Sequence, residues 1–237
     1  MNKKILLLST LLLLGISCKK EAVETIDPII DVVIDPVIIP TSKPPNILFI
    51  IADDVGIEAT PGYPIGAIKP HMPNLERLAA EGITFENVWA YPVCSPTRAS
   101  IITGKTGYRT GVLNAENAST IPPSEITLHS FLDENTNAAY SHAILGKWHL
   151  SRNEPNRPTE MGVGHYAGLL GGGVADYSSW SFTQNGETNN STEYITTKIT
   201  DLAIEWIGEQ EKPWFCWVAY TAPHTPFHLP PTNMHSQ

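Results

Sequence analysis

The feature that most constrains the fold is an apolar run within residues 46–52, which ends abruptly at Asp53 and Asp54. A continuous apolar run bounded by polar residues is typical of a strand that is buried on both faces of a sheet. We expect a second buried strand over residues 214–220 and a further strand over residues 138–145.

Helical segments separate these strands. Four segments carry helical periodicity or residues typical of helix boundaries, and we expect helices over residues 73–81, 95–103, 127–134 and 191–210. Residues 83–90 alternate between apolar and polar side chains, which predicts one more strand. Strands that alternate with helices indicate an α/β fold, with a mainly parallel or mixed central sheet flanked by helices.

Residues 1–17 have the organisation of a secretory signal peptide. Two lysines precede an apolar run over residues 5–14, which is too short to span a bilayer. The run leads into Cys18 in a way that resembles the lipobox of bacterial lipoproteins, although Gly15 stands where a leucine is usual. We expect Cys18 to be lipidated and to anchor the protein to a membrane. An ordinary cleaved leader with an incidental cysteine is the alternative.

Residues 18–45 are predicted to be a tether, because prolines recur too often there for a helix or a central strand. With the leader, this predicts an exported protein of the periplasm or cell surface, whose folded part is residues 46–237. The formal net charge of −9 argues against nucleic acid as a partner, because binding it requires an excess of Lys and Arg.

Polar residues follow the predicted strands or begin a helix at four places, and ligands gather at the carboxyl ends of strands in such sheets. These residues are Asp53, Asp54, Cys94, Arg98, Lys147, His149 and His224. Considered singly, each of these residues also has an ordinary structural explanation, as part of a solvated turn, a surface lysine, a histidine with satisfied hydrogen bonds or a buried cysteine. Two carboxylates directly beyond a buried strand nevertheless need a partner. Hard oxygen ligands suit Ca²⁺ or Mg²⁺.

Together these segments resemble the type I sulfatases, the formylglycine-dependent arylsulfatase family of the alkaline phosphatase superfamily. The Cys-Ser-Pro-Thr-Arg segment at residues 94–98 is similar to the family's Cys-x-Pro-x-Arg signature, and Gly-Lys-Trp-His-Leu at residues 146–150 to its second signature. The opening strand with its aspartates, the segment after it and the substrate-histidine loop are matched at residues 46–54, 71–75 and 222–227. All these landmarks occur in the family's order.

The resemblance implies that Cys94 is oxidised after translation to formylglycine by a maturation enzyme that recognises Pro96 and Arg98. The aldehyde hydrates to a diol, one hydroxyl attacks the sulfur of the substrate, and loss of a proton from the other hydroxyl later eliminates sulfate. This is covalent catalysis that divides one difficult step into two. Arg98 is also implied to hold the hydrate.

The resemblance further implies that Asp53, Asp54 and the modified Cys94 bind Ca²⁺, with Mg²⁺ as the second choice. Lys147 would place a positive charge beside the transferred group, and His149 would contact the diol and act as the base for elimination. His224 would bind the sulfate and protonate the leaving oxygen. Residues 171–173, three glycines, are expected to be a simple turn, because no Lys-Ser/Thr follows them as in a phosphate loop.

The implied function is that of a sulfatase acting on a sulfated glycan or an aryl sulfate. A phosphonate or phosphate ester hydrolase of the same superfamily is the alternative enzyme, and an inactive lipoprotein or binding module is the non-enzymatic alternative. In the family, two further metal ligands, normally an Asp-Asn or Asp-His pair, and a second lysine lie downstream of the histidine loop. Residues 228–237 contain no candidate for this pair of ligands. We therefore expect this chain to be the N-terminal portion of a longer protein, and to be inactive alone.

Overall fold

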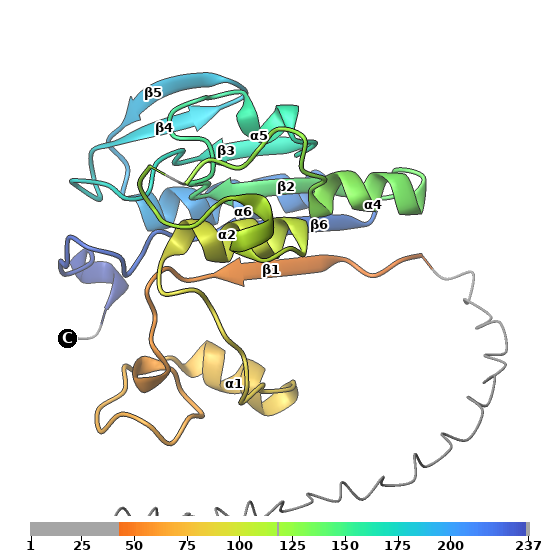
Figure 1. The fold of residues 1–237 in the computed structure, drawn as a ribbon. Helices are drawn as coiled ribbons and strands as arrows, with labels where there is room; N and C mark the ends of the chain where they lie inside the picture. The colour runs from red at the N-terminus through yellow and green to blue at the C-terminus, as the bar shows by residue number, and fades with distance from the viewer. Residues whose placement is uncertain (1–42, 118, 236–237) are drawn as a thin grey trace, which may run out of the picture. The chain divides into compact units, whose positions relative to one another are not determined.

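The computed structural model describes residues 43–117 and 119–235 (Figure 1). The predicted signal peptide, Cys18 and the tether up to residue 42 lie outside these residues, so the predictions made for them stay predictions. Within the described part of the chain, no helix is both long and apolar enough to cross a membrane.

The centre of the fold is a six-stranded mixed sheet with the strand order β1-β6-β2-β3-β4-β5. The pairs β1–β6, β6–β2 and β2–β3 are parallel, whereas β3–β4 and β4–β5 are antiparallel. The strands are β1 (Ile47–Ile51), β2 (Ser141–Gly146), β3 (His165–Gly168), β4 (Trp180–Gln184), β5 (Glu187–Ser191) and β6 (Trp214–Ala219). The predicted α/β fold with a mixed sheet is therefore confirmed, and β3 and the hairpin β4–β5 are additions that the sequence patterns did not predict.

The four predicted helices are present with ends that differ by at most a few residues. The helices are α1 (Pro73–Glu81), α2 (Cys94–Thr103), α3 (Gly107–Thr110), α4 (Leu128–Thr136), α5 (Arg157–Glu160) and α6 (Ile195–Gly208), with short 3-10 turns η1 (Ile57–Ala59) and η2 (Thr232–Met234). Gly104 ends α2 because its φ of +66° is a left-handed conformation that favours glycine. Thr127 caps α4 by accepting a hydrogen bond from the Ser130 amide at 3.2 Å.

Helices cover both faces of the sheet (Figure 1), with α2 and α4 packed on one face and α6 on the other. Along β6, Phe215 and Trp217 face α2 and α4, whereas Cys216 and Val218 face α6. Successive side chains of a strand point to opposite faces, so both sets are buried and the whole strand is apolar. This arrangement explains the uninterrupted apolar pattern of β6.

Two strand predictions are wrong in part or in full. β1 is a strand but it lies at the edge of the sheet, and Leu48 and Ile50 are 50% and 53% exposed rather than buried. Residues 83–90 form no strand, and Trp89 is 93% exposed. An apolar or alternating pattern becomes a buried strand only where partners cover both of its edges and both of its faces. Within the described residues, β1 has a partner strand on one edge only, and residues 83–90 pair with no strand.

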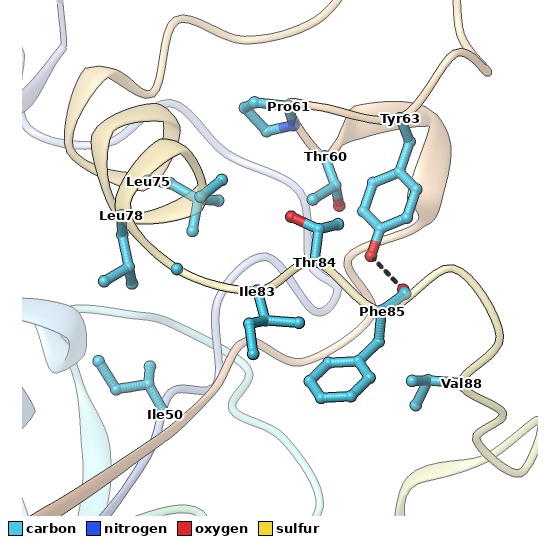
Figure 2. A pocket seen from close by; sticks show the side chains of 12 residues that line it. Ile50, Thr60, Pro61, Tyr63, Leu75, Leu78, Ile83, Thr84, Phe85 and Val88 are labelled. Atoms are coloured by element: carbon cyan, nitrogen blue, oxygen red, sulfur yellow. Dashed lines mark hydrogen bonds between the residues drawn. The ribbon is translucent and has the colours of Figure 1, made fainter.

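Part of this exposed apolar surface encloses a hollow of about 670 Å³ between β1, α1 and residues 83–88 (Figure 2). Ile50, Leu75, Leu78, Ile83 and Phe85 contribute apolar side chains to it. None of the polar residues that the sequence analysis selected lines this hollow. The chemistry predicted for the chain therefore lies elsewhere.

Candidate active site

The predicted site residues come from four segments that the sheet brings to one edge. Because β1, β6 and β2 are adjacent and parallel, their carboxyl ends lie side by side. Backbone hydrogen bonds continue the pairing beyond the strands: the Lys147 amide donates to Ala219 at 2.8 Å, and the Asp53 amide donates to Ala222 at 3.2 Å. These bonds fix the backbone positions of Lys147 and Asp53, and therefore the points from which their side chains extend.

A buried group of three charged side chains forms the centre of the site. The Lys147 ammonium donates to Asp53 Oδ2, and Arg98 Nη2 lies 3.5 Å from Asp53 Oδ1. Arg98 Nη1 donates to the Lys147 carbonyl at 2.6 Å, which links the two cations through the backbone. All three residues are at most 6% exposed. Two cations therefore share one carboxylate, and this excess of buried positive charge favours the binding of an anion.

Arg98 has capacity left for a ligand. Its Nε has no hydrogen-bond partner within the described residues, and its Nη2 has only the long ion pair with Asp53. Burial lowers the pKa of Arg98, and the Asp53 carboxylate opposes this shift. A guanidinium nevertheless stays charged in proteins, so Arg98 presents unpaired donors from a rigid planar group.

Cys94 lies at the start of α2, and its Sγ is 3.0 Å from His149 Nδ1. The Ser95 hydroxyl donates to the His149 carbonyl at 2.8 Å, so the same helix end holds both the ring and the backbone of His149. Burial, and then the charges of Lys147 and Arg98, lower the pKa of His149 to about 4. The imidazole is therefore neutral at pH 7 and able to accept a proton beside Cys94.

His224 lies on the loop that follows β6, with one quarter of its side chain exposed. Its Nδ1 is 2.8 Å from the Thr225 carbonyl, and because a carbonyl only accepts hydrogen bonds, Nδ1 carries a proton. Its Nε2 lies 3.8 Å from Asp54 Oδ2. Nε2 is thus the ring nitrogen that remains available for a substrate.

The two adjacent aspartates have different environments. Asp53 is 6% exposed, whereas the Asp54 side chain is 58% exposed and its backbone has a φ of +63°. Their carboxylates are of the type that Ca²⁺ or Mg²⁺ prefers, but Ca²⁺ takes about six to eight oxygen ligands. The described residues include no group of three or more His, Cys, Asp or Glu residues that could hold a metal. Asp53 and Asp54 thus have the ligand chemistry that such an ion prefers, but two carboxylates are fewer ligands than its shell needs.

The structure thus brings together Asp53, Cys94, Arg98, Lys147 and His149, and places Asp54 and His224 beside each other. A hollow of about 320 Å³ is lined in common by Asp53, Asp54, Cys94 and Arg98.

Sequence reasoning did not identify Ser95 or Tyr177 as parts of the site. The Tyr177 hydroxyl donates to the His224 carbonyl. Ser95 could have been found from its place beside Cys94, whereas no pattern singles out Tyr177.

Comparison with known proteins agrees with this arrangement. The family model described as Sulfatase matches residues 45–233. The chain is 31% identical to Arylsulfatase J of Mus musculus over an alignment of 208 positions, which covers 78% of this chain and 33% of that protein. It is 35% identical to the N-acetylglucosamine-6-O-sulfatase of Bacteroides thetaiotaomicron over 187 residues, 77% of this chain and 31% of that protein.

Solved structures show the same fold. The structure of Ps i-CgsB in complex with k-i-k-neocarrahexaose matches with a TM-score of 0.67 and 27% identity, over 78% of this chain and 46% of that chain. A complex with the substrate D-glucosamine-2-N,6-O-disulfate matches with a TM-score of 0.63 and 34% identity, over 77% of this chain and 35% of that chain. The chain therefore spans between about a third and a half of the length of these relatives.

Proposed function

The chain belongs to the sulfatase family, and we propose that the protein hydrolyses sulfate esters. The observation that carries this proposal is the buried group in which Lys147 and Arg98 share the single carboxylate of Asp53, next to Cys94. A sulfate group is an anion whose oxygens match the unpaired donors of Arg98. Fixed charges in a buried site stabilise negative charge in a transition state more strongly than water does, because they are already oriented.

We propose that Cys94 is converted to formylglycine, with a maturation enzyme as a partner of the chain. When present, formylglycine supplies a hydrated aldehyde whose hydroxyl is the nucleophile toward sulfur. His149 is placed to remove a proton at this position, because its Nδ1 lies 3.0 Å from Cys94 Sγ and its pKa is low enough to keep it neutral. Arg98 and Lys147 hold the sulfate oxygens, and His224 donates a proton from Nε2 to the leaving oxygen.

Asp53 and Asp54, with the modified Cys94, are the residues that would hold Ca²⁺, in preference to Mg²⁺. Bound there, Ca²⁺ supplies additional positive charge that polarises the sulfate group. The described residues include no cluster of three or more His, Cys, Asp or Glu side chains, so these two carboxylates alone would not complete the shell of such an ion.

We infer a sulfated carbohydrate as the substrate class, with aryl sulfates as surrogates. The support is that relatives of this chain include an N-acetylglucosamine-6-O-sulfatase and a structure in complex with a disulfated glucosamine. The proposal concerns the whole protein, because the chain spans only part of its relatives. An exported location with a lipid anchor at Cys18 completes the proposal and rests on the sequence alone.

A paired assay tests the proposed function. The whole protein is co-expressed with a formylglycine-generating enzyme, the peptide that contains Cys94 is examined by mass spectrometry, and hydrolysis of 4-methylumbelliferyl sulfate and phosphate is compared. We expect conversion of Cys94 to the aldehyde and hydrolysis of the sulfate ester. Cys94→Ala should lose both, whereas Cys216→Ala, at the buried cysteine of β6, should keep both. Hydrolysis of the phosphate ester alone would favour the alternative enzyme, and Cys94 left as a thiol would contradict the mechanism.

A further inference from the structure

The three glycines at residues 171–173 lie against both histidines of the site. They belong to the connection between β3 and β4. A β carbon built on Gly172 would lie 2.3 Å from Cε1 and 2.6 Å from Nε2 of His149. One built on Gly173 would lie 3.1 Å from Cε1 and 3.3 Å from Nδ1 of His224. One built on Gly171 would have no atom within 4 Å.

The contact at Gly172 is a matter of space and not of backbone conformation. The φ of Gly172 lies outside the left-handed range, so alanine could adopt the same backbone there. Real β carbons essentially never approach another atom within 3.0 Å. An alanine at this position would therefore force the His149 ring or the loop to move by about 1 Å, because ordinary contact begins near 3.4 Å.

Backbone hydrogen bonds hold the glycines at this place. The amides of Trp148 and His149 donate to the carbonyls of Leu169 and Leu170 at 2.9 Å and 3.0 Å, which extends the pairing of β2 with β3. The residues just before the glycines are thus attached to the backbone of His149 itself. These bonds oppose a withdrawal of the loop, and the contacted atoms belong to the end of the His149 side chain, so we expect the ring of His149 to move.

The same connection also holds the loop of His224. Tyr177 is 3% exposed, and its hydroxyl donates to the His224 carbonyl and lies 3.4 Å from the Thr221 carbonyl. Its ring packs against the ring of His228 with a centroid distance of 4.0 Å. Residues 172–177 therefore lie against His149 at one end, through Gly172, and against His224 at two points, through Gly173 and Tyr177.

We propose that residues 172–177 form a positioning segment that sets the placement of His149 relative to Cys94 and to His224, and that Gly172 must lack a side chain for this purpose. The inference rests on the proposed function, in which these two histidines transfer protons. Proton transfer requires hydrogen-bond distances, and a displacement of about 1 Å at a reacting group can reduce the rate about 100-fold. Gly172 is a positioning residue, because it acts through His149.

Alanine substitutions at the three glycines test the proposal, since they add the same methyl group at neighbouring sites. We expect Gly172→Ala to shift the imidazole NMR signals of His149 at fixed pH and to lower kcat by about 10- to 100-fold with little change in KM. Gly173→Ala should shift the signals of His224 alone, with a smaller loss of kcat. Gly171→Ala is the matched control and should change neither.

A double-mutant cycle separates positioning from general loss of stability. If the added methyl group clashes with the imidazole, the decrease in Tm caused by Gly172→Ala should disappear in the His149→Ala background. The nuclear Overhauser effect between the Gly172 α protons and the His149 ring in the unsubstituted chain checks the contact even if a variant does not fold. Absence of this effect, or an equal decrease in Tm in both backgrounds, would overturn the proposal.

The experiment also distinguishes the inference from the proposed function. The NMR and Tm measurements use the chain with Cys94 unmodified and require no turnover. If they behave as expected while the matured protein hydrolyses no sulfate ester, the placement of His149 by Gly172 stands and the proposed function fails. If sulfate hydrolysis is normal and Gly172→Ala leaves kcat and the His149 signals unchanged, the positioning inference is wrong.

Discussion

Replacing Asp53 with asparagine should strongly destabilise the protein, because Asp53 is the one carboxylate between two buried cations. Asparagine keeps the shape and an oxygen acceptor for Lys147, so the change removes mainly the charge. At the 3.5 Å between Arg98 Nη2 and Asp53 Oδ1, an effective dielectric constant of about 20 gives an attraction of about 5 kcal/mol. Breaking a buried pair typically costs about 3–5 kcal/mol. We expect a loss in that range, out of a typical total stability of about 5–15 kcal/mol.

Asp54→Asn is the matched control, since Asp54 is the neighbouring aspartate and its side chain is 58% exposed. We expect this variant to change the free energy of unfolding by less than about 0.5 kcal/mol. Both free energies are measured by urea denaturation at pH 7 in the presence of EDTA, followed by the fluorescence of the buried tryptophans Trp148 and Trp217.

The effect of added sulfate on stability is a second, independent measure of the charge balance around Asp53. In Asp53→Asn, the cations Lys147 and Arg98 remain without a carboxylate partner. Sulfate should therefore restore more stability to Asp53→Asn than to Asp54→Asn, when each is compared with chloride at the same ionic strength. A loss below about 1 kcal/mol for Asp53→Asn, or equal recovery by both variants, would refute the reasoning that the site carries an excess of buried positive charge.

Three further predictions concern the fold. His129 is fully buried, and burial, followed by the charge of His142, lowers its pKa to about 3. The folded state therefore binds fewer protons than the unfolded state, and stability should decrease as the pH falls from about 6.5 towards 3. In urea denaturation at several pH values, the free energy of unfolding of His129→Phe should depend less on pH than that of the unsubstituted chain, and an unchanged slope would contradict this. Thr127→Ala should cost about 1–2 kcal/mol of unfolding free energy, because its hydroxyl caps α4 and donates to the Met161 carbonyl at 2.8 Å, whereas Thr127→Ser should cost much less. Ile199→Ala should cost about 2–5 kcal/mol in the same assay by opening a cavity between α6 and the sheet, and a loss below 1 kcal/mol would show that this face repacks freely.

The positions of strands and helices were largely predictable because the signals are local. The ends of α2 follow from residues such as Gly104, and the apolar pattern of β6 reflects burial on both faces. β1 has a similar pattern but is an edge strand with exposed side chains. Hydropathy reports that a segment tends to be buried, and it does not identify the segment that covers it.

The candidate site was likewise predictable only in part. The residue types and their order along the chain identified Cys94, Arg98, Lys147, His149 and His224 and the family to which the chain belongs. Nothing local distinguishes Asp53 from Asp54, although one is buried against Lys147 and the other is exposed. The sequence predicts only a simple turn at the glycines of residues 171–173, because the absence of a side chain carries no information about which residue lies beside it.

The sequence by itself indicated the helices α1, α2, α4 and α6, the strands β1, β2 and β6, and the reactive side chains that stand at their ends, since these depend on residues a few positions apart. Only the tertiary structure decided that Lys147 and Arg98 share one carboxylate, and that Gly172 borders the ring of His149. These contacts join segments far apart in the chain at distances of 2–4 Å. Such distances are set by how the sheet and its connections pack, and a local pattern carries no information about them.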